Sequence, residues 1–254
     1  MSADRREVIV LPEQGALVGA AARQFIDRAR DAVSTRGIFT VALSGGSTPR
    51  PLYELLSAAP YKDEIDWEKV HVFFSDERFV PPDSSASNYH MVCDCLLSKV
   101  PMFERFVHPV ATENGTPGEA AALYEEGLRR VFAVGLTEVP RFDLVLLGMG
   151  EDGHIASLFP GTQAVSEEDR LVVESTVPGT NARRVTFTLK LINAARCVMF
   201  LIEGRAKAEA VRRALDGDAL PAALVRPTNG ELVWLLDESS AGGVAVPVTR
   251  RQTL

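Results

Sequence analysis

Residues 142–160 read FDLVLLGMGEDGHIASLFP, and this stretch decides the fold. Its apolar beginning is short and leads into a glycine-rich segment, a pattern typical of a buried strand that opens into a loop. The loop carries Asp152 and His154, an acid and a histidine two residues apart. Open α/β sheets hold their functional sites in the loops at the carboxyl ends of parallel strands. We therefore expect a parallel sheet with His154 at its edge, where a histidine can act as a general base near neutral pH.

Strand-like and helix-like segments alternate on both sides of this stretch. Steady alternation predicts an α/β fold with a single doubly wound, mostly parallel sheet and helices on both faces. The segment 75–85 is expected to be irregular, and no linker or internal repeat divides the chain, so residues 1–254 are interpreted as one domain. The expected strands are 7–11, 38–43, 70–74, 142–148, 171–177, 184–189, 196–202 and 231–236, and the expected helices are 12–36, 49–56, 88–98, 117–134 and 205–215.

The bulk composition is that of an ordinary globular protein, with 46% apolar and 24% charged residues. The net charge of −7 argues against a general nucleic-acid binder, which needs a basic face. It still allows a local basic pocket for a small anionic substrate.

The ends of the chain and its cysteines point to the cytoplasm. The charged N-terminus leads directly into a strand-like segment, the last strand is followed by a polar tail, and no apolar stretch approaches the roughly 20 residues of a membrane span. Cys93 and Cys95 fall on an expected helix and Cys197 in an expected strand. Their number and spacing suit neither a metal knuckle nor a redox pair, so we expect free thiols in a reducing compartment.

Residues 43–49 read LSGGSTP and join a strand to a helix. Two glycines allow a sharp turn and a close approach of the backbone to a ligand. With Thr48 as N-cap and Pro49 as the first helical residue, free amides and the positive end of the helix dipole would face the loop, an arrangement that binds phosphate. The alternative is a tight polar turn without a ligand. The candidate phosphate ligands here are Ser44, Gly45, Gly46, Ser47 and Thr48.

Charged residues follow three other expected strands. Asp76 and Arg78 come where an apolar strand ends; Arg78 could bind a phosphate with two hydrogen bonds, and Asp76 could orient a hydroxyl or take a proton. Arg184 and Lys207 are further phosphate candidates, although solvated surface charge is the alternative for each group. Lys207 is preferred to Arg205 because a cation in the first turn of a helix is unfavourable unless an anion is bound. The choice among Arg183, Arg184, Arg205 and Lys207 stays open.

The four histidines differ in their surroundings. His71 lies inside an apolar strand and His90 on a helix, and both are interpreted as structural, while His108 lies in a connecting segment. Only His154 combines a glycine loop, a nearby acid and a strand end; a capping histidine is the alternative. Neither two histidines nor a histidine and a cysteine have metal-ligand spacing, so no metal and no cofactor is expected.

These segments together resemble the 6-phosphogluconolactonases, within the larger group that also holds the glucosamine-6-phosphate deaminases. Residues 43–49 are similar to the phosphate loop of that group, and residues 75–78 with 87–89 to the second lactonase motif. Residues 148–162 resemble the lactonase signature, and residues 184–186 and 204–207 fit the later pattern. The resemblance covers roughly residues 38–236.

The same resemblance separates two chemistries. Deaminases of the group place a glutamate after their aspartate-glycine-histidine segment, and this glutamate forms a relay with the histidine for ring opening and isomerisation. This chain has Leu158 and Phe159 there, and Phe159 cannot move a proton. Deaminases also carry a tyrosine where this chain has Arg78. The resemblance therefore implies a lactonase.

The implied substrate is 6-phospho-D-glucono-1,5-lactone, hydrolysed in the oxidative pentose phosphate pathway. The phosphate would bind residues 44–48 with Arg78, Lys207 and Arg184, while His154 removes a proton from water and Asp152 orients the site or favours the imidazolium. A small sugar phosphate is thus the expected partner, and the protein is expected to act as a monomer. Two rivals remain: an isomerase or deaminase that uses Asp76 as its carbon base, and a sugar-phosphate sensor without turnover.

Overall fold

The computed structural model describes residues 6–242 and 244. The first five residues of the charged N-terminus, and residues 243 and 245–254 of the polar tail, lie outside the described residues. No helix among the described residues is long and apolar enough to cross a membrane.

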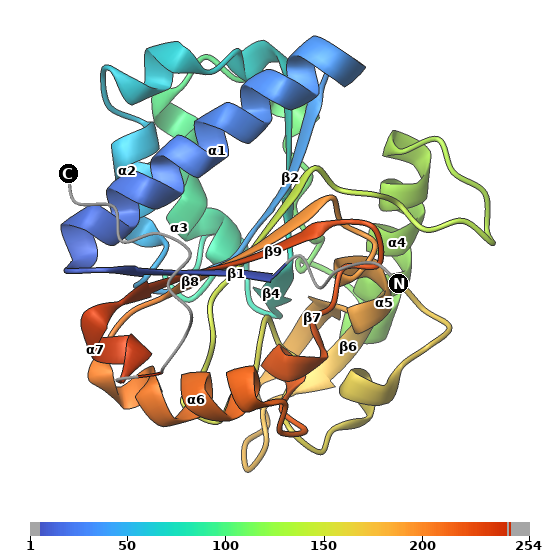
Figure 1. Cartoon of the computed structure of the whole chain (residues 1–254). Coiled ribbons are helices and arrows are strands. Elements are labelled where there is room, and N and C mark those ends of the chain that lie inside the picture. Colours follow the sequence, from blue (N-terminus) through green and yellow to red (C-terminus); the bar gives the residue numbers. More distant parts are fainter. Residues whose placement is uncertain (1–5, 243, 245–254) are drawn as a thin grey trace.

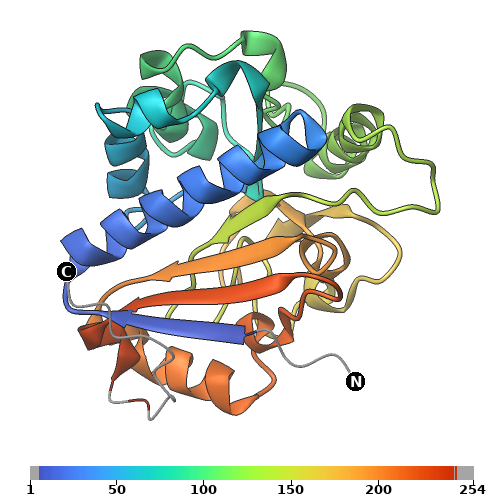
Figure 2. The ribbon, with the colours of Figure 1, turned by 45° about the horizontal axis from the view of Figure 1, so that its top comes forward.

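Six parallel strands form the main sheet, in the order β1-β9-β8-β5-β2-β3 (Figure 2). Each one coincides with an apolar run of the sequence, and the mostly parallel α/β fold is confirmed. The strands are β1 (Arg6–Leu11), β2 (Phe39–Leu43), β3 (Val70–Phe74), β5 (Leu144–Leu147), β8 (Cys197–Ile202) and β9 (Glu231–Asp237).

Helices cover both faces of this sheet because successive side chains of a strand point to opposite sides. Leu144 and Leu146 of β5 pack on the face that carries α1 (Gln14–Arg36), α2 (Arg50–Leu56) and α3 (Asn88–Cys95) (Figure 1). Val145 and Leu147 pack on the opposite face. That face carries α4 (Pro117–Val131), α5 (Leu189–Ile192), α6 (Ala208–Asp216) and α7 (Glu238–Ala241).

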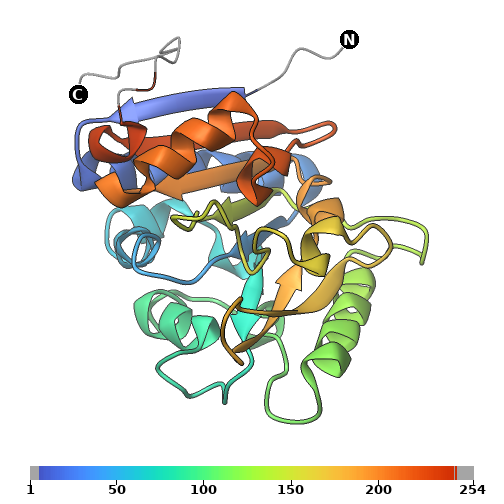
Figure 3. The same cartoon turned by 90° about the horizontal axis from the view of Figure 1, so that it is seen from below.

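A second, antiparallel sheet corrects the expectation of a single sheet. It has the order β4-β7-β6 and contains β4 (Asp76–Arg78), β7 (Arg183–Phe187) and β6 (Val172–Thr176) (Figure 3). Strand β4 falls in the segment expected to be irregular. Its pairing partner lies about a hundred residues away, as Arg78↔Arg184 shows, so no local pattern marks it as a strand. The alternating pattern of β6 and β7 suits an antiparallel sheet with one buried face.

The chain leaves two neighbouring strands of the main sheet in opposite directions. Strands β2 and β5 are paired, but β2 continues through α2 to β3 on one side, whereas β5 leads to β8 on the other. Such a switch point opens a crevice at the carboxyl ends of the strands. The loops after Leu43 and Leu147 both open into this crevice, so the fold brings together the two glycine-rich segments of the sequence.

Candidate active site

A cavity of about 250 Å³ lies at the switch point. It brings together most of the residues that the sequence singled out, with Asp152 and Arg184 outside its immediate wall. The wall is made of Ser44, Gly45, Gly46, Ser47, Thr48, Pro49, Asp76, Arg78, Asn88, Gly148, Met149, Gly150, His154, Ala156 and Lys207.

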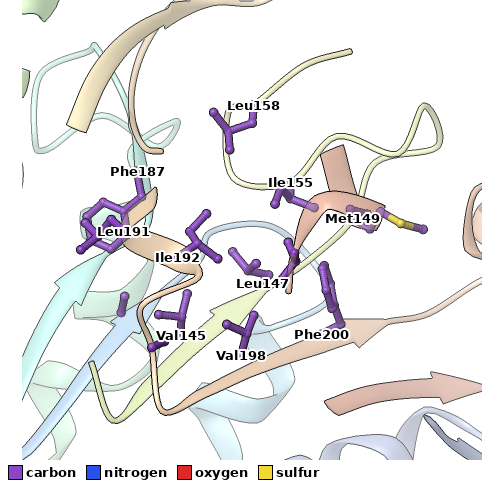
Figure 4. Packing of buried hydrophobic residues seen from close by; sticks show 14 of the residues in the cluster. Val145, Leu147, Met149, Ile155, Leu158, Phe187, Leu191, Ile192, Val198 and Phe200 are labelled. Carbon is purple, nitrogen blue, oxygen red and sulfur yellow. The ribbon is translucent and has the colours of Figure 1, made fainter. Parts of the chain in front are cut away.

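Apolar side chains fix the histidine loop to the core. Figure 4 shows Ile155 and Leu158 of the loop above Leu147 of β5 and near Ile192 of α5. Ile155 and Leu158 are fully buried, and their backbones are joined by a hydrogen bond from Leu158 N to Ile155 O. The loop is therefore held rigidly on the sheet, as a precise site requires.

His154 and Asp152 form a close pair on this rigid loop. Their Nδ1 and Oδ1 atoms are 2.6 Å apart, and the backbone N–H of His154 donates to the same oxygen. Burial alone would raise the pKa of Asp152, but the hydrogen bonds and the charge of His154 outweigh it and lower that pKa. An ionised Asp152 can only accept, so Nδ1 carries a proton, and in the neutral form of the imidazole it is Nε2 that holds the lone pair.

Phe159 and Gly150 complete the surroundings of the imidazole. The Phe159 ring is 6% exposed, and its centroid lies 4.7 Å from that of His154. A Cβ atom on Gly150 would lie 2.1 Å from Nδ1 of His154 and 2.6 Å from Oδ1 of Asp152. Gly150 is therefore required because the histidine and the acid lie directly against its Cα atom.

The glycine loop faces the histidine across the cavity. Gly46 has a φ of 109°, a backbone conformation that favours glycine. The Ser44 hydroxyl contacts Leu146 O at 2.7 Å and Ser75 Oγ at 2.8 Å, so it joins the strands together, whereas Ser47 is exposed. The expectation that Thr48 caps α2 is wrong: the cap position is Pro49, without a side-chain cap bond, because the loop makes one further turn before the helix begins.

Asp76 is held in the wall by two side chains that sequence reasoning had not assigned. Ser157 Oγ donates to Asp76 Oδ2 at 2.7 Å, and Asn88 Nδ2 lies 3.3 Å from Asp76 Oδ1. Asp76, Asn88 and Ser157 are all buried. Both new residues lie in segments quoted for the family resemblance, but no local pattern marks either as a partner of Asp76.

Glu77 is a third residue that the sequence analysis missed, and it holds the start of α3. Its carboxylate accepts from the backbone N–H groups of Arg78, Asn88 and Tyr89, and from the Ser87 hydroxyl. Burial raises the pKa of the Glu77 carboxyl, while the three backbone N–H groups oppose that shift. Asp76 and Arg78, the two neighbours of Glu77 in β4, line the cavity. Glu77 therefore fixes the backbone that carries both side chains.

Arg78 in the cavity wall has Arg184, just outside that wall, as its neighbour across two strands. Arg78 of β4 is in register with Arg184 of β7, and Arg78 Nη1 donates to Ala86 O at 2.6 Å. Burial and the charge of Arg78 lower the pKa of Arg184. A bound anion would offset this repulsion, so the pair suits a phosphate group.

The other candidate cations are separated by the structure. Lys207 ends a 3₁₀ turn (Arg205–Lys207) just before α6 and contributes to the cavity wall. Arg205 is exposed outside the wall, and Arg183 Nη2 pairs with Glu174 Oε2 at 2.6 Å. Lys207 and Arg78 thus face the glycine loop across one small space.

Metal-ligand groups and cysteines are the other candidates in the described part of the chain. Within residues 6–242 and 244, no group of three or more histidine, cysteine or acidic residues could hold a metal ion. Cys93 and Cys95 lie in α3 and Cys197 in β8, and all three are free thiols, as expected.

Comparison with known proteins places the chain among characterised relatives. The model of the family "Glucosamine-6-phosphate isomerases/6-phosphogluconolactonase" matches residues 12–234. A 6-phosphogluconolactonase from Nostoc is 39% identical over 95% of this chain and 100% of its own, and one from Synechocystis is 41% identical over 92% and 96%.

Solved structures of similar proteins share the fold of this chain. A 6-phosphogluconolactonase from Trypanosoma cruzi has a TM-score of 0.85 and 31% identity, covering 97% of this chain and 99% of its own. A monomeric glucosamine-6-phosphate deaminase has a TM-score of 0.77 at 20% identity, covering 92% of this chain and 98% of its own, which shows a shared fold alone.

Proposed function

Since this chain belongs to the family of glucosamine-6-phosphate isomerases and 6-phosphogluconolactonases, we propose that it hydrolyses 6-phospho-D-glucono-1,5-lactone to 6-phospho-D-gluconate, the second step of the oxidative pentose phosphate pathway. The observation that carries the proposal is the His154–Asp152 pair, which faces a glycine loop and two cations across one cavity. This arrangement offers a base at one end and an anion site at the other. The proposal invokes no metal and no cofactor.

The phosphate of the substrate binds at the glycine loop. Backbone amides of residues 44–48 and the Ser47 and Thr48 hydroxyls contact it, and Arg78, Lys207 and Arg184 neutralise its two charges. Holding the phosphate fixes the far end of the sugar, so that the lactone carbonyl lies beside His154. This positioning makes the reaction effectively unimolecular, so less entropy is lost in reaching the transition state.

His154 then acts as the general base. Its Nε2 lone pair takes a proton from water while the water oxygen attacks C1, and the resulting imidazolium is stabilised by Asp152. The proton returns to the ring oxygen as the C1–O bond breaks and the acid forms. Asp76, fixed by Ser157 and Asn88, orients a substrate hydroxyl or takes a proton during this opening.

A coupled assay tests the proposal. Freshly generated 6-phosphogluconolactone is mixed with the protein, and 6-phosphogluconate is followed with its dehydrogenase above the spontaneous rate. The His154→Ala variant should fold normally and lose about 10²–10⁴-fold in turnover, the usual contribution of a general base. Turnover by this variant close to that of the wild type removes His154 from the role, and the absence of any wild-type turnover removes the function.

Each of the two rival functions predicts a different result. A deaminase would release ammonia from glucosamine 6-phosphate, but the buried Phe159 lies against His154 where a carboxylate relay would be needed. A sugar-phosphate sensor would bind 6-phosphogluconate without accelerating hydrolysis. Phe159 thus argues against the deaminase, and the His154–Asp152 pair favours the hydrolase over the sensor.

The enzyme is further proposed to work in the cytoplasm as a single-domain monomer. Its large exposed apolar side chains, among the described residues, are few and belong to different segments of the chain: Ile38, Phe103, Leu123, Leu136 and Leu224. Light scattering on the purified protein should give the mass of one chain, 27.6 kDa. A stable dimer mass at working concentration contradicts this part of the proposal.

A further inference from the structure

Asn88, the first residue of α3, is 1% exposed and lies in the wall of the cavity. Its Nδ2 donates to Asp76 O at 2.8 Å and lies 3.3 Å from Asp76 Oδ1. Both of these neighbours are acceptors, so they determine which way the amide faces. The donor end contacts Asp76, and the carbonyl end must face the opposite direction.

The carbonyl end of Asn88 lies against Gly45 of the glycine loop. A Cβ atom on Gly45 would be 1.7 Å from Asn88 Oδ1 and 2.3 Å from Cγ. Oδ1 is buried and has no hydrogen-bond partner in the described part of the chain. Gly45 is thus required for the space that the Asn88 amide occupies, whereas Gly46 is required for its φ of 109°.

The backbone of Asn88 is itself fixed. Its N–H donates to Glu77 Oε1 at 2.7 Å, and the cap of α3 is supplied by Ser87, whose Oγ accepts from His90 N. The Asn88 side chain is therefore not needed to start the helix. A buried amide oxygen without a partner is unfavourable, and an apolar side chain would fill the same space without it. The Asn88 amide contributes an N–H donor that contacts Asp76.

We propose that Asn88 is a positioning residue that sets the separation between the glycine loop, which holds the phosphate, and Asp76 near the reacting carbon. The inference rests on the proposed function for the identity of the two ends. The glycine loop and β4 follow different strands, and the Asn88 side chain in the cavity wall lies against Gly45 and donates to Asp76 O. A substrate held at both ends depends on this separation.

Kinetics on two lactones test whether Asn88 sets the separation between the glycine loop and Asp76. The Asn88→Ala variant should lose at least about ten-fold in kcat/KM on the phosphorylated lactone, and less on gluconolactone, which has no phosphate to place. The Asn88→Asp variant puts a second carboxylate against Asp76, so the acidic limb of its pH–rate profile should move to higher pH. The His90→Ala variant, on the same helix but outside the cavity, serves as the control.

A double-mutant cycle tests the contact between Gly45 and Asn88 by measuring binding, without any turnover. Gly45→Ala alone should weaken the binding of 6-phosphogluconate, measured by calorimetry, at least ten-fold because the new methyl group displaces Asn88. In the Asn88→Gly background the same substitution should cost much less, since the space is free. Equal losses in both backgrounds overturn the contact.

The outcomes separate the two proposals. If Asn88→Ala lowers the unfolding midpoint but leaves the ratio of the two lactones unchanged, and Asn88→Asp leaves the pH profile unchanged, Asn88 only packs and the inference is overturned. If the wild type has no lactonase activity but the binding cycle shows the expected compensation, the proposed function fails and the positioning role stands.

Discussion

The Cα atoms of Gly45 and Gly150 each lie against a polar side chain of the site. Neither glycine has the left-handed φ that usually explains a glycine in a loop, in contrast to Gly46 and Gly153. The sequence predicts that the two glycines of residues 43–49 allow a sharp turn and a close approach to a ligand, and the positive φ that such a turn uses is found only at Gly46. At Gly45 and Gly150 the absent side chain makes room for Asn88 and His154.

Gly150→Ala should therefore impair catalysis more than binding. Its methyl group would lie 2.1 Å from His154 Nδ1, so the imidazole must move. A displacement of about 1 Å costs on the order of 10²-fold in turnover, and we expect kcat to fall by about that factor with KM little changed. Gly127→Ala in α4, where a Cβ atom meets nothing within 4 Å, is the matched control in the coupled assay. Normal kcat in Gly150→Ala would contradict this account.

Arg78→Ala should act on the phosphate end instead. Removing this guanidinium leaves the His154–Asp152 pair intact, so we expect the preference for the phosphorylated lactone over gluconolactone to fall by about ten-fold or more. The ratio of kcat/KM for the two lactones measures it. Arg205→Ala, an exposed arginine outside the cavity wall, is the control. Equal losses on both lactones would remove Arg78 from phosphate binding.

Among the elements, β4 and the start of α3 are joined through one carboxylate. Glu77 accepts four hydrogen bonds from residues of both elements, and it is 2% exposed. A second link between the strand and the helix is the hydrogen bond from Asn88 Nδ2 to Asp76 O. The wall that carries Asp76, Arg78 and Asn88 is thus a single unit.

Glu77→Gln should destabilise this unit although it preserves size. The amide group cannot accept at its NH₂ end, so at least one buried donor loses its partner, and the free energy of unfolding should fall by about 1–3 kcal/mol. Urea unfolding followed by circular dichroism measures it. Glu126→Gln, an exposed position on α4, should leave the midpoint unchanged. A Glu77→Gln midpoint equal to that of the wild type would contradict the role of the carboxylate.

Sequence patterns predict the elements that have a local signature. Every strand of the main sheet is an apolar run, and the His154 loop is recognisable from its glycines and its position. Strand β4 and the partners of Asp76 could not be found in this way, because their contacts depend on pairing with β7 and on α3. Asn88, Glu77 and Ser157 become functional only when distant segments meet.

At the scale of the whole molecule, a pair of histidines links stability to pH. His71 Nδ1 and His108 Nε2 are 3.2 Å apart, between the rings of Phe106 and Phe73. Burial, together with the charge of His71, lowers the pKa of His108 to about 4. In the unfolded chain a histidine has a pKa of about 6.5. Between that pH and the lower pKa of the folded protein, the unfolded state binds a proton at His108 that the folded state does not bind.

Folding stability should therefore fall as the pH drops from about 6.5 to about 4, and His108→Gln should reduce that loss. Urea midpoints at about pH 7.5 and about pH 5 measure the effect, which we expect to be smaller in the variant than in the wild type. His90→Gln, at a partly exposed histidine on α3, should keep the wild-type dependence. An identical pH dependence in His108→Gln would show that His108 does not cause the loss.

Strand β1 has β9 as its neighbour in the sheet, with Arg6 opposite Leu232. During synthesis the ribosome releases β1 first and β9 last of all the strands described here. The first strand therefore stays unpaired until β9 has been made. Lys207 also emerges late, so a nascent chain that already displays the glycine loop and His154 still lacks one wall of its cavity. Substrate binding should thus begin only after Lys207 has emerged from the ribosome, as a late event of folding.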